Sequence, residues 1–214
     1  CCSKQIVKSI KHGIAEFMIK LIHKIVSNHR AYDLSQWVAG ASLNWKVFLE
    51  EFASLPATGC VLDIGGGTGL IRPLLPKGWK YFCLDPDPHK LVGFRAKFPE
   101  DKAVQASACK IPLDSKSFDL CIMFAVAHHL NDEEFRLSLC EIERLLRPGG
   151  KFILMDAIWN PANLRGRFLW ALDRGSFPKT QETLMNRLGE HFSIQSTRNW
   201  KVHHEYAMFW CLKN

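Results

Sequence analysis

The residues best placed to do chemistry are a run of glycines that follows an apolar segment and an acidic residue. The run reads Val61-Leu62-Asp63-Ile64-Gly65-Gly66-Gly67-Thr68-Gly69. Glycines at 65, 67 and 69 let the chain turn sharply out of a buried strand and bring its backbone close to a ligand. The dinucleotide fingerprint requires its last glycine at position 70, where this chain has Leu70. The spacing predicts a strand, a tight loop and a helix at a nucleotide-like ligand, with an ordinary glycine turn as the alternative.

A second carboxylate ends the next apolar segment, Trp79 to Asp85. Asp85 stands 22 residues after Asp63, about where an acidic side chain accepts hydrogen bonds from two ribose hydroxyls. The alternative is an aspartate that caps a helix or a turn, which the nearby Pro86 and Pro88 favour. The two roles are compatible.

The glycine run resembles the first motif of the class I S-adenosylmethionine-dependent methyltransferases, which reads apolar, apolar, acidic, x, Gly, x, Gly, x, Gly. The similarity is to the small-molecule type known as methyltransferase domain 11. It continues through residues 106–120 and through the turn Arg147-Pro148-Gly149-Gly150-Lys151-Phe152, so it spans about residues 43 to 158. The resemblance implies S-adenosyl-L-methionine as the cofactor, held by Asp63, Gly65, Gly67, Gly69 and Asp85.

One position departs from the family pattern. Ser107 stands where the family usually has an aspartate that accepts a hydrogen bond from the adenine amino group. A hydroxyl is a weaker, uncharged acceptor. A backbone N–H of Ala108 or Cys109 offers a contact to an adenine ring nitrogen, so we expect Ser107 and Ala108 to line the adenine site with weakened recognition.

Two histidines follow the fourth predicted strand, Asp119 to Ala127. His128 and His129 lie at the carboxyl edge of the sheet, where ligands of open α/β sheets bind. Methyl transfer from a sulfonium needs chiefly alignment, and a hydroxyl acceptor also needs a general base. We therefore predict His128 or His129 as that base; the alternative is that one imidazole only caps the next helix or fills the wall. No metal is predicted, because His203-His204 lack a ligand partner at metal-binding spacing.

The elements that must position these residues form an α/β fold. Strands and helices alternate from residue 59 to 158, which predicts a parallel sheet with helices on both faces. One such helix runs from a cap at Asn131 through Leu146, and the strand Lys151–Ile158 follows it. The strands 193–202 and 205–212 are joined too closely for a crossover, so they form a hairpin. The prediction is a Rossmann-like, seven-stranded, mostly parallel sheet with an antiparallel last strand.

The N-terminal region differs in charge from the rest of the chain. We divide the chain into residues 1–30, a basic amphipathic helix, and residues 31–214, the methyltransferase domain. Residues 1–30 contain six basic residues and one acidic residue, so this segment carries five of the seven net positive charges. Apolar residues recur at three- and four-residue steps. The segment 4–27 therefore suits either contact with an anionic membrane surface or a lid packed over its own domain.

Composition restricts the other partners and the compartment. The eight cysteines form no CxxC pair, which favours a reducing compartment and by default the cytoplasm. No apolar run approaches 18 residues, so no transmembrane helix is expected. A nucleic-acid substrate is disfavoured because no Asn-Pro-Pro-aromatic motif follows the fourth strand and no Pro-Cys nucleophile is present.

The acceptor is expected to be a small or lipid-like molecule. Residues 159–180 mix aromatic residues with Arg165, Arg167 and Arg174, which suits substrate selection; the alternative is a helix, residues 164–172, packed on the sheet. Two other functions stay open: a catalytically silent binding or scaffold protein with this fold, and a methyltransferase acting on nucleic acid or protein. The oligomeric state is not readable from the sequence.

Overall fold

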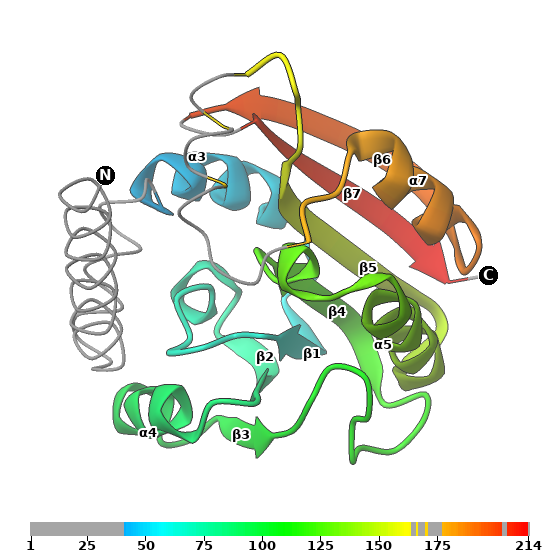
Figure 1. Cartoon of the computed structure of the whole chain (residues 1–214). Coiled ribbons are helices and arrows are strands. Elements are labelled where there is room, and N and C mark those ends of the chain that lie inside the picture. The colour runs from blue at the N-terminus through cyan, green and yellow to red at the C-terminus, as the bar shows by residue number, and fades with distance from the viewer. Residues whose placement is uncertain (1–40, 164–165, 167–169, 171–176, 203–204, 214) are drawn as a thin grey trace, which may run out of the picture.

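The computed structural model of the chain describes residues 41–163, 166, 170, 177–202 and 205–213, with side chains from residue 45 onward (Figure 1). The predicted basic helix of residues 1–30 lies outside the described residues, as do Arg165, Arg167 and Arg174. The described strands are β1 (Thr58–Ile64), β2 (Gly78–Asp85), β3 (Lys102–Gln105), β4 (Phe118–Phe124), β5 (Leu146–Ile158), β6 (Phe192–Lys201) and β7 (Glu205–Lys213). The helices are α3 (Ala41–Phe52), α4 (Pro88–Lys97), α5 (Asp132–Leu145) and α7 (Gln181–Gly189), with 3-10 turns η1 (Arg72–Leu74) and η2 (Ala127–His129).

The strands form one sheet in the order β3-β2-β1-β4-β5-β7-β6. Strands β1 to β5 pair in parallel, whereas β7 runs antiparallel to both of its neighbours, β5 and β6. The short connection between β6 and β7 makes the predicted hairpin. The predicted seven-stranded, mostly parallel sheet with an antiparallel last strand is therefore confirmed.

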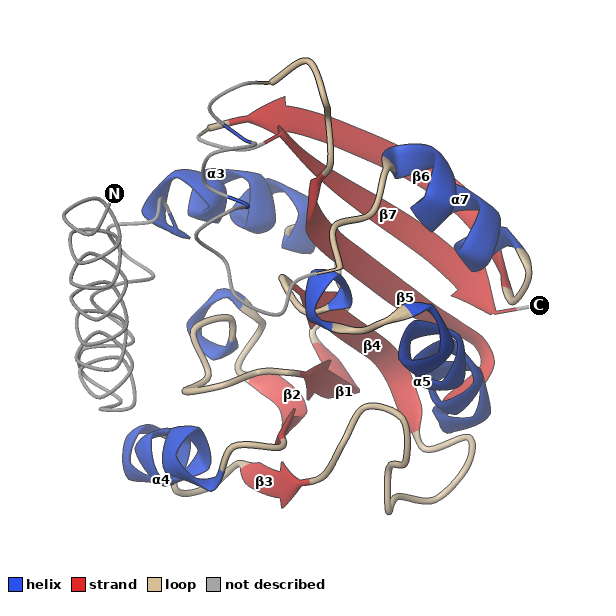
Figure 2. Ribbon diagram, in the orientation of Figure 1, coloured by secondary structure: helices blue, strands red, loops and turns tan. Residues whose placement is uncertain are grey.

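Helices cover both faces of this sheet, as Figures 1 and 2 show. Successive strand residues point to opposite faces. Leu62 and Leu154 pack with α5 and α7 in one core cluster, and Val61 and Ile153 pack with α3 and α4 in the other. Both clusters are built from fully buried aliphatic and aromatic side chains, which supply the main favourable free energy of folding. Two cores separated by the sheet hold its carboxyl edge in place.

The helix α5 begins and ends for local reasons. The Asn131 side chain accepts from the Glu134 N–H at 2.9 Å, and the Glu134 carboxylate accepts from the Asn131 N–H at 2.9 Å, so the predicted cap is a complete capping box. The helix ends at Leu145, one residue before the prediction. Strand β5 begins at Leu146 rather than at Lys151, because Leu146 pairs with Phe118 ahead of an irregularity in the register.

Strand β4 is shorter than the sequence pattern predicts. The prediction extended it to Ala127, but the strand ends at Phe124. Ala125 takes a positive φ of 55°, which an extended strand does not allow, and its N–H donates to the Met155 carbonyl at 2.8 Å. The reversal brings residues 127–129 into η2, so both histidines sit in a turn beyond the sheet.

The helix α3 is fixed beside the same edge by contacts with distant segments. The Phe48 ring stacks on Phe124 at 5.0 Å between centroids. At the other side of the helix, Glu51 accepts from the Trp210 indole N–H at 2.7 Å and from Arg198 at 2.9 Å. The helix therefore joins the end of β4 to the β6–β7 hairpin.

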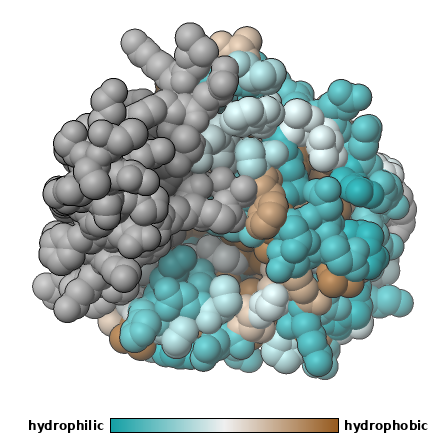
Figure 3. Space-filling model, in the orientation of Figure 1, coloured by the Kyte–Doolittle hydropathy of each residue, from teal (hydrophilic) through white to brown (hydrophobic). Residues whose placement is uncertain are grey.

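The described surface on the face shown in Figure 3 is largely hydrophilic, with small separate hydrophobic areas. Among the described helices, none is long and apolar enough to span a bilayer.

The glycine loop gives a test of the backbone argument. In Gly65→Ala the new Cβ would lie 2.3 Å from Val126 Cγ2, at a φ of 74°. We expect a loss of about 1–3 kcal/mol in the free energy of unfolding, measured by chemical denaturation. The matched control is Gly189→Ala at the end of α7, where the new Cβ meets nothing within 4 Å. Equal stability of the two variants would contradict the prediction.

Candidate functional site

A cavity of about 610 Å³ opens at the carboxyl ends of β1, β2 and β4. This is the edge at which ligands of open α/β sheets bind. Most predicted site residues line it: Asp63, Gly65, Asp85, Ser107, Ala108, His128 and His129. Gly67 and Gly69 do not line the cavity, but they shape the loop that does. The structure thus brings together residues from four separate segments of the sequence.

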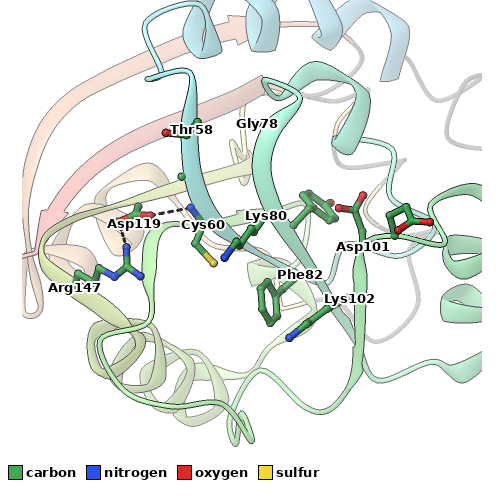
Figure 4. A pocket seen from close by; sticks show the side chains of 12 residues that line it. Thr58, Cys60, Gly78, Lys80, Phe82, Asp101, Lys102, Asp119 and Arg147 are labelled. Atoms are coloured by element: carbon green, nitrogen blue, oxygen red, sulfur yellow. Dashed lines mark hydrogen bonds and ion pairs between the residues drawn. The ribbon is translucent and has the colours of Figure 1, made fainter.

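A larger cavity, about 790 Å³, lies at the opposite, amino ends of the strands (Figure 4). It contains none of the predicted site residues. Two of its carboxylates are ion-paired, because Arg147 donates to Asp119 at 2.6 Å and Arg72 donates to Asp101 at 2.6 Å. We therefore assign the functional site to the smaller cavity at the carboxyl edge.

The glycine loop is closed by hydrogen bonds to the end of β2. The N–H groups of Gly65 and Gly66 both donate to the Leu84 carbonyl, at 2.7 and 3.1 Å. Gly65, Gly67 and Gly69 all have positive φ, at 74°, 56° and 79°, a region in which glycine carries no steric penalty. At Gly69 a Cβ would lie 2.6 Å from the Phe94 ring. The spacing of these glycines is therefore explained by backbone conformation and by close packing.

Asp85 ends β2 and holds the loop from the other side. Its Oδ2 accepts from the Gly67 N–H at 3.1 Å, and its Oδ1 accepts from the Asp87 N–H at 2.8 Å. The Lys90 ammonium lies 3.8 Å from Oδ2. Burial raises the pKa of the Asp85 carboxyl, and Lys90 and the two N–H donors oppose that rise. The residue both supports the turn, as the alternative interpretation expected, and lines the cavity.

Asp63 lies deeper than Asp85, with 2% of its surface exposed. Its Oδ2 accepts a hydrogen bond from the Tyr81 hydroxyl on β2. The pKa of Asp63 is raised to about 7, mainly by burial. The charge of Asp85 adds to this rise, and the Tyr81 hydrogen bond opposes it. Tyr81 is a partner that the sequence pattern did not predict. Asp63 is therefore a buried acid at the floor of the cavity.

Ser107 and Ala108 lie on the wall that follows β3. The Ser107 hydroxyl accepts from the Cys109 N–H at 3.2 Å, which forms a local turn. Of the two N–H groups predicted to reach adenine, that of Cys109 is therefore engaged inside the turn. Ala108 is 8% exposed and lines the cavity beside Ser107.

His128 is paired with a carboxylate that the sequence reasoning missed. The His128 ring nitrogen Nδ1 lies 2.5 Å from Asp156 Oδ1, and the backbone N–H of His128 donates to Asp156 Oδ2 at 3.0 Å. Asp156 is 1% exposed and sits near the end of β5. With Asp156 at Nδ1, the neutral imidazole carries its proton there and presents Nε2 as the basic nitrogen. A lone carboxylate near the end of an apolar strand, a pattern that Asp85 shares, is the signal that could have pointed to Asp156.

Aromatic side chains line another part of the cavity, among aliphatic ones such as Ile71, Leu130 and Met155. His129 stacks obliquely on His128 with ring centroids 4.0 Å apart, and Trp170 meets His128 edge-on at 5.4 Å. Burial, and then the charge of Asp156, raises the pKa of Tyr206. The aromatic lining comes from α3, β4, residue 170 and β7: Trp45, Phe48, Phe124, Trp170 and Tyr206. Within the described residues, no group of three or more His, Cys, Asp or Glu side chains is placed to hold a metal ion.

The residues at the carboxyl edge fit a nucleoside cofactor. The backbone of Gly65 and Gly66 forms part of the wall, and a Cβ on Gly66 would lie 2.8 Å from the Asp63 carboxylate. Because Gly65 and Gly66 have no side chains, the loop can lie directly against the Asp63 and Asp85 carboxylates. A carboxylate beside a glycine loop can accept from ribose hydroxyls, so the fold and the site together fit the class I methyltransferase type.

Comparison with known sequences agrees with that class. Residues 62–154 match the family model described as "Methyltransferase domain". The chain is similar to an uncharacterised methyltransferase of Mycobacterium tuberculosis, 38% identical over 106 residues. It is also similar to an uncharacterised methyltransferase-like protein of Schizosaccharomyces pombe, 35% identical over 115 residues. These alignments cover 49% and 52% of this chain but 41% of each relative. Residues 62–154 therefore match a methyltransferase domain, and the chain spans less than half the length of these relatives.

Solved structures share the fold at low sequence identity. A chain in the complex of the Haloferax volcanii Trm112 methyltransferase activator with a putative methyltransferase has a TM-score of 0.70 and 15% identity, covering 88% of this chain and 97% of that one. The N-methyltransferase NodS of Bradyrhizobium japonicum, solved with S-adenosyl-L-homocysteine, has a TM-score of 0.67 and 15% identity, covering 80% and 86%. The Rossmann-like methyltransferase fold is therefore established.

The raised pKa of Asp63 predicts a pH dependence of stability. Its folded value of about 7 lies above the unfolded value of about 3.9. The folded state therefore binds this proton more tightly, and the resulting stability is complete below the unfolded value and is lost as the pH rises through 7. We expect the free energy of unfolding of the unliganded protein, minus that of Asp63→Asn, to fall between pH 5 and pH 7.5. A pH-independent difference would contradict the assignment.

Proposed function

We propose that the protein is an S-adenosyl-L-methionine-dependent methyltransferase. The observation that carries the proposal is one cavity that joins the glycine loop, the buried Asp85 and the His128–Asp156 pair. The methyltransferase domain match supports it. The acidic ribose site would hold the cofactor, and the histidine oriented by a carboxylate would act on the acceptor. Both lie in one cavity, as methyl transfer requires, because the acceptor atom must be aligned with the methyl group of the cofactor.

Asp85 and the glycine loop would hold the nucleoside. The Asp85 carboxylate would accept from the ribose hydroxyls, and the backbone of Gly65 and Gly66 would face the methionine part. Ser107 and Ala108 would line the adenine, and Asp63 lies at the floor, where a carboxylate favours an ammonium group. When bound, S-adenosyl-L-methionine supplies a methyl group already activated by the sulfonium charge.

His128 is the stronger candidate for the general base. Asp156 fixes its ring by accepting at Nδ1 and stabilises the imidazolium that forms when Nε2 takes a proton from the acceptor. His129 lines the cavity and stacks on the His128 ring, so we assign it to the wall. The aromatic lining would exclude water from the transfer.

The acceptor is proposed to be a small or lipid-like molecule, because five aromatic side chains and several aliphatic ones line the same cavity. The basic, amphipathic sequence of residues 4–27 supports peripheral contact with an anionic membrane, or a lid, and the cysteine pattern supports a cytoplasmic location. The second candidate is a silent scaffold with this fold, which the serine at position 107 favours.

Removal of the ribose carboxylate tests the cofactor site. We expect Asp85→Asn to weaken the binding of S-adenosyl-L-homocysteine at least about tenfold, since a hydrogen bond to a charged group contributes about 1.5–3 kcal/mol. Titration calorimetry measures the dissociation constant. The control is Asp119→Asn at the opposite end of the sheet, which keeps an acceptor for the Cys60 N–H and should bind normally. If the folded wild-type protein binds neither S-adenosyl-L-methionine nor its product, the scaffold function is favoured.

Removal of the base tests the acceptor half. We expect His128→Ala to lower kcat about 10²–10⁴-fold and Asp156→Asn to lower it in the same direction, with little change in S-adenosyl-L-homocysteine affinity. His129→Ala, the matched control, should have a much smaller effect. The measurement is transfer of labelled methyl groups to cell extracts fractionated by molecular mass, which also identifies the acceptor class. A His128→Ala variant as active as the wild type would remove His128 from the mechanism.

A further inference from the structure

A buried lysine lies behind the His128 turn, outside the residues that line the cavity. Lys179 is 5% exposed. Its ammonium donates to three backbone carbonyls: Leu130 at 2.6 Å, Ala127 at 3.1 Å and Phe177 at 3.2 Å. An ammonium has three N–H donors, so these carbonyls match its full capacity. Two of the three flank His128 and His129 in the sequence.

The same turn is held from two further directions. The Phe177 N–H donates to the His128 carbonyl at 2.5 Å, and Asp156 accepts from the His128 N–H. The Lys179 carbonyl in turn accepts from the Trp159 N–H at 2.9 Å, at the end of β5. Residues 177–179 thus close a loop of hydrogen bonds between η2 and β5, around the His128–Asp156 pair.

Burying this charge costs free energy that must be offset locally. Burial lowers the pKa of Lys179, and the charges of Asp132, Asp156 and Glu134 oppose that change. The ammonium also lies 5.4 Å from the centre of the Phe135 ring, a favourable cation–π distance. A lysine that served only to cover the apolar core would be replaceable by methionine; here the turn carbonyls would lose their donor.

We propose that Lys179 is a positioning residue that fixes the His128 turn, so that the imidazole stays paired with Asp156 and moves as one unit with the segment 177–179. The consequence for methyl transfer rests on the proposed function, whereas the positioning itself does not. Asp156 orients the ring of His128, and Lys179 sets where the backbone of the turn lies. The segment 177–179 and the His128 turn are thereby linked through one side chain.

The test uses the tautomer of His128 as its readout. The full-length protein is labelled with ¹⁵N-histidine, and the imidazole nitrogen shifts of His128 are assigned by comparison with His128→Asn. In the wild type we expect the proton on Nδ1. In Lys179→Met we expect loss of this single-tautomer signature. The matched control is Lys213→Met, because Lys213 also donates to two backbone carbonyls, of Glu143 and Leu146, at 2.5 and 2.8 Å, far from His128 in the fold.

A retained His128 tautomer in a folded Lys179→Met protein would overturn the proposal, as would an equal change in Lys213→Met. If Lys179→Met does not fold, Lys179→Arg replaces it. The planar guanidinium keeps the charge but cannot donate to three carbonyls from a single nitrogen, so the tautomer signature should again be lost. Unchanged shifts in Lys179→Arg would overturn the proposal.

Calorimetry with S-adenosyl-L-homocysteine separates this result from the proposed function. We expect Lys179→Met to bind it within about twofold of the wild type, since Lys179 does not line the cavity. Failure of all variants and the wild type to bind would reject the proposed function without affecting the tautomer result. With an acceptor identified, kcat should fall about tenfold or more while the KM for S-adenosyl-L-methionine is unchanged.

Discussion

The carboxyl edge of the sheet depends on one constraint, that buried backbone groups must find hydrogen-bond partners. Strands that end at a common edge, followed by sharp turns, leave several such groups without a partner in the ladder. Asp85 accepts from Gly67, Asp156 accepts from His128, and Lys179 donates to Ala127 and Leu130. Two of the side chains that complete these turns, Asp85 and Asp156, are thus also the groups to which we assign roles in cofactor binding and in orienting His128.

This double use fixes the orientation of the carboxylates at the edge. A carboxylate with N–H donors on both oxygens, as in Asp85, has one orientation before any ligand arrives. The Asp156 carboxylate is similarly fixed by the N–H groups of His128 and Ala157. Preorganised groups need not be reoriented at the moment of reaction, which is the main source of electrostatic catalysis.

Sequence reasoning predicted the parts of this arrangement that are local. The glycines, Asp85, the capping box at Asn131 and the final hairpin each follow from residues within one turn or one strand. Asp156 and Lys179 were missed because their partners lie 28 and about 50 residues away in the chain. The end of β4 was missed because alanine at 125 gives no sign of a positive φ. Long-range pairing and a strained non-glycine residue have no periodic pattern by which to find them.

Two different sets of elements form the two halves of the cavity. The loops after β1, β2 and β3 make the half beside Asp85, and α3, η2 and β7 make the aromatic half. Trp45 and Phe48 come from a helix that is joined to the hairpin by Glu50 and Glu51. On the proposed function, substitutions that reshape the aromatic half would therefore change the acceptor, while the contacts around Asp85 that hold the cofactor stay as they are.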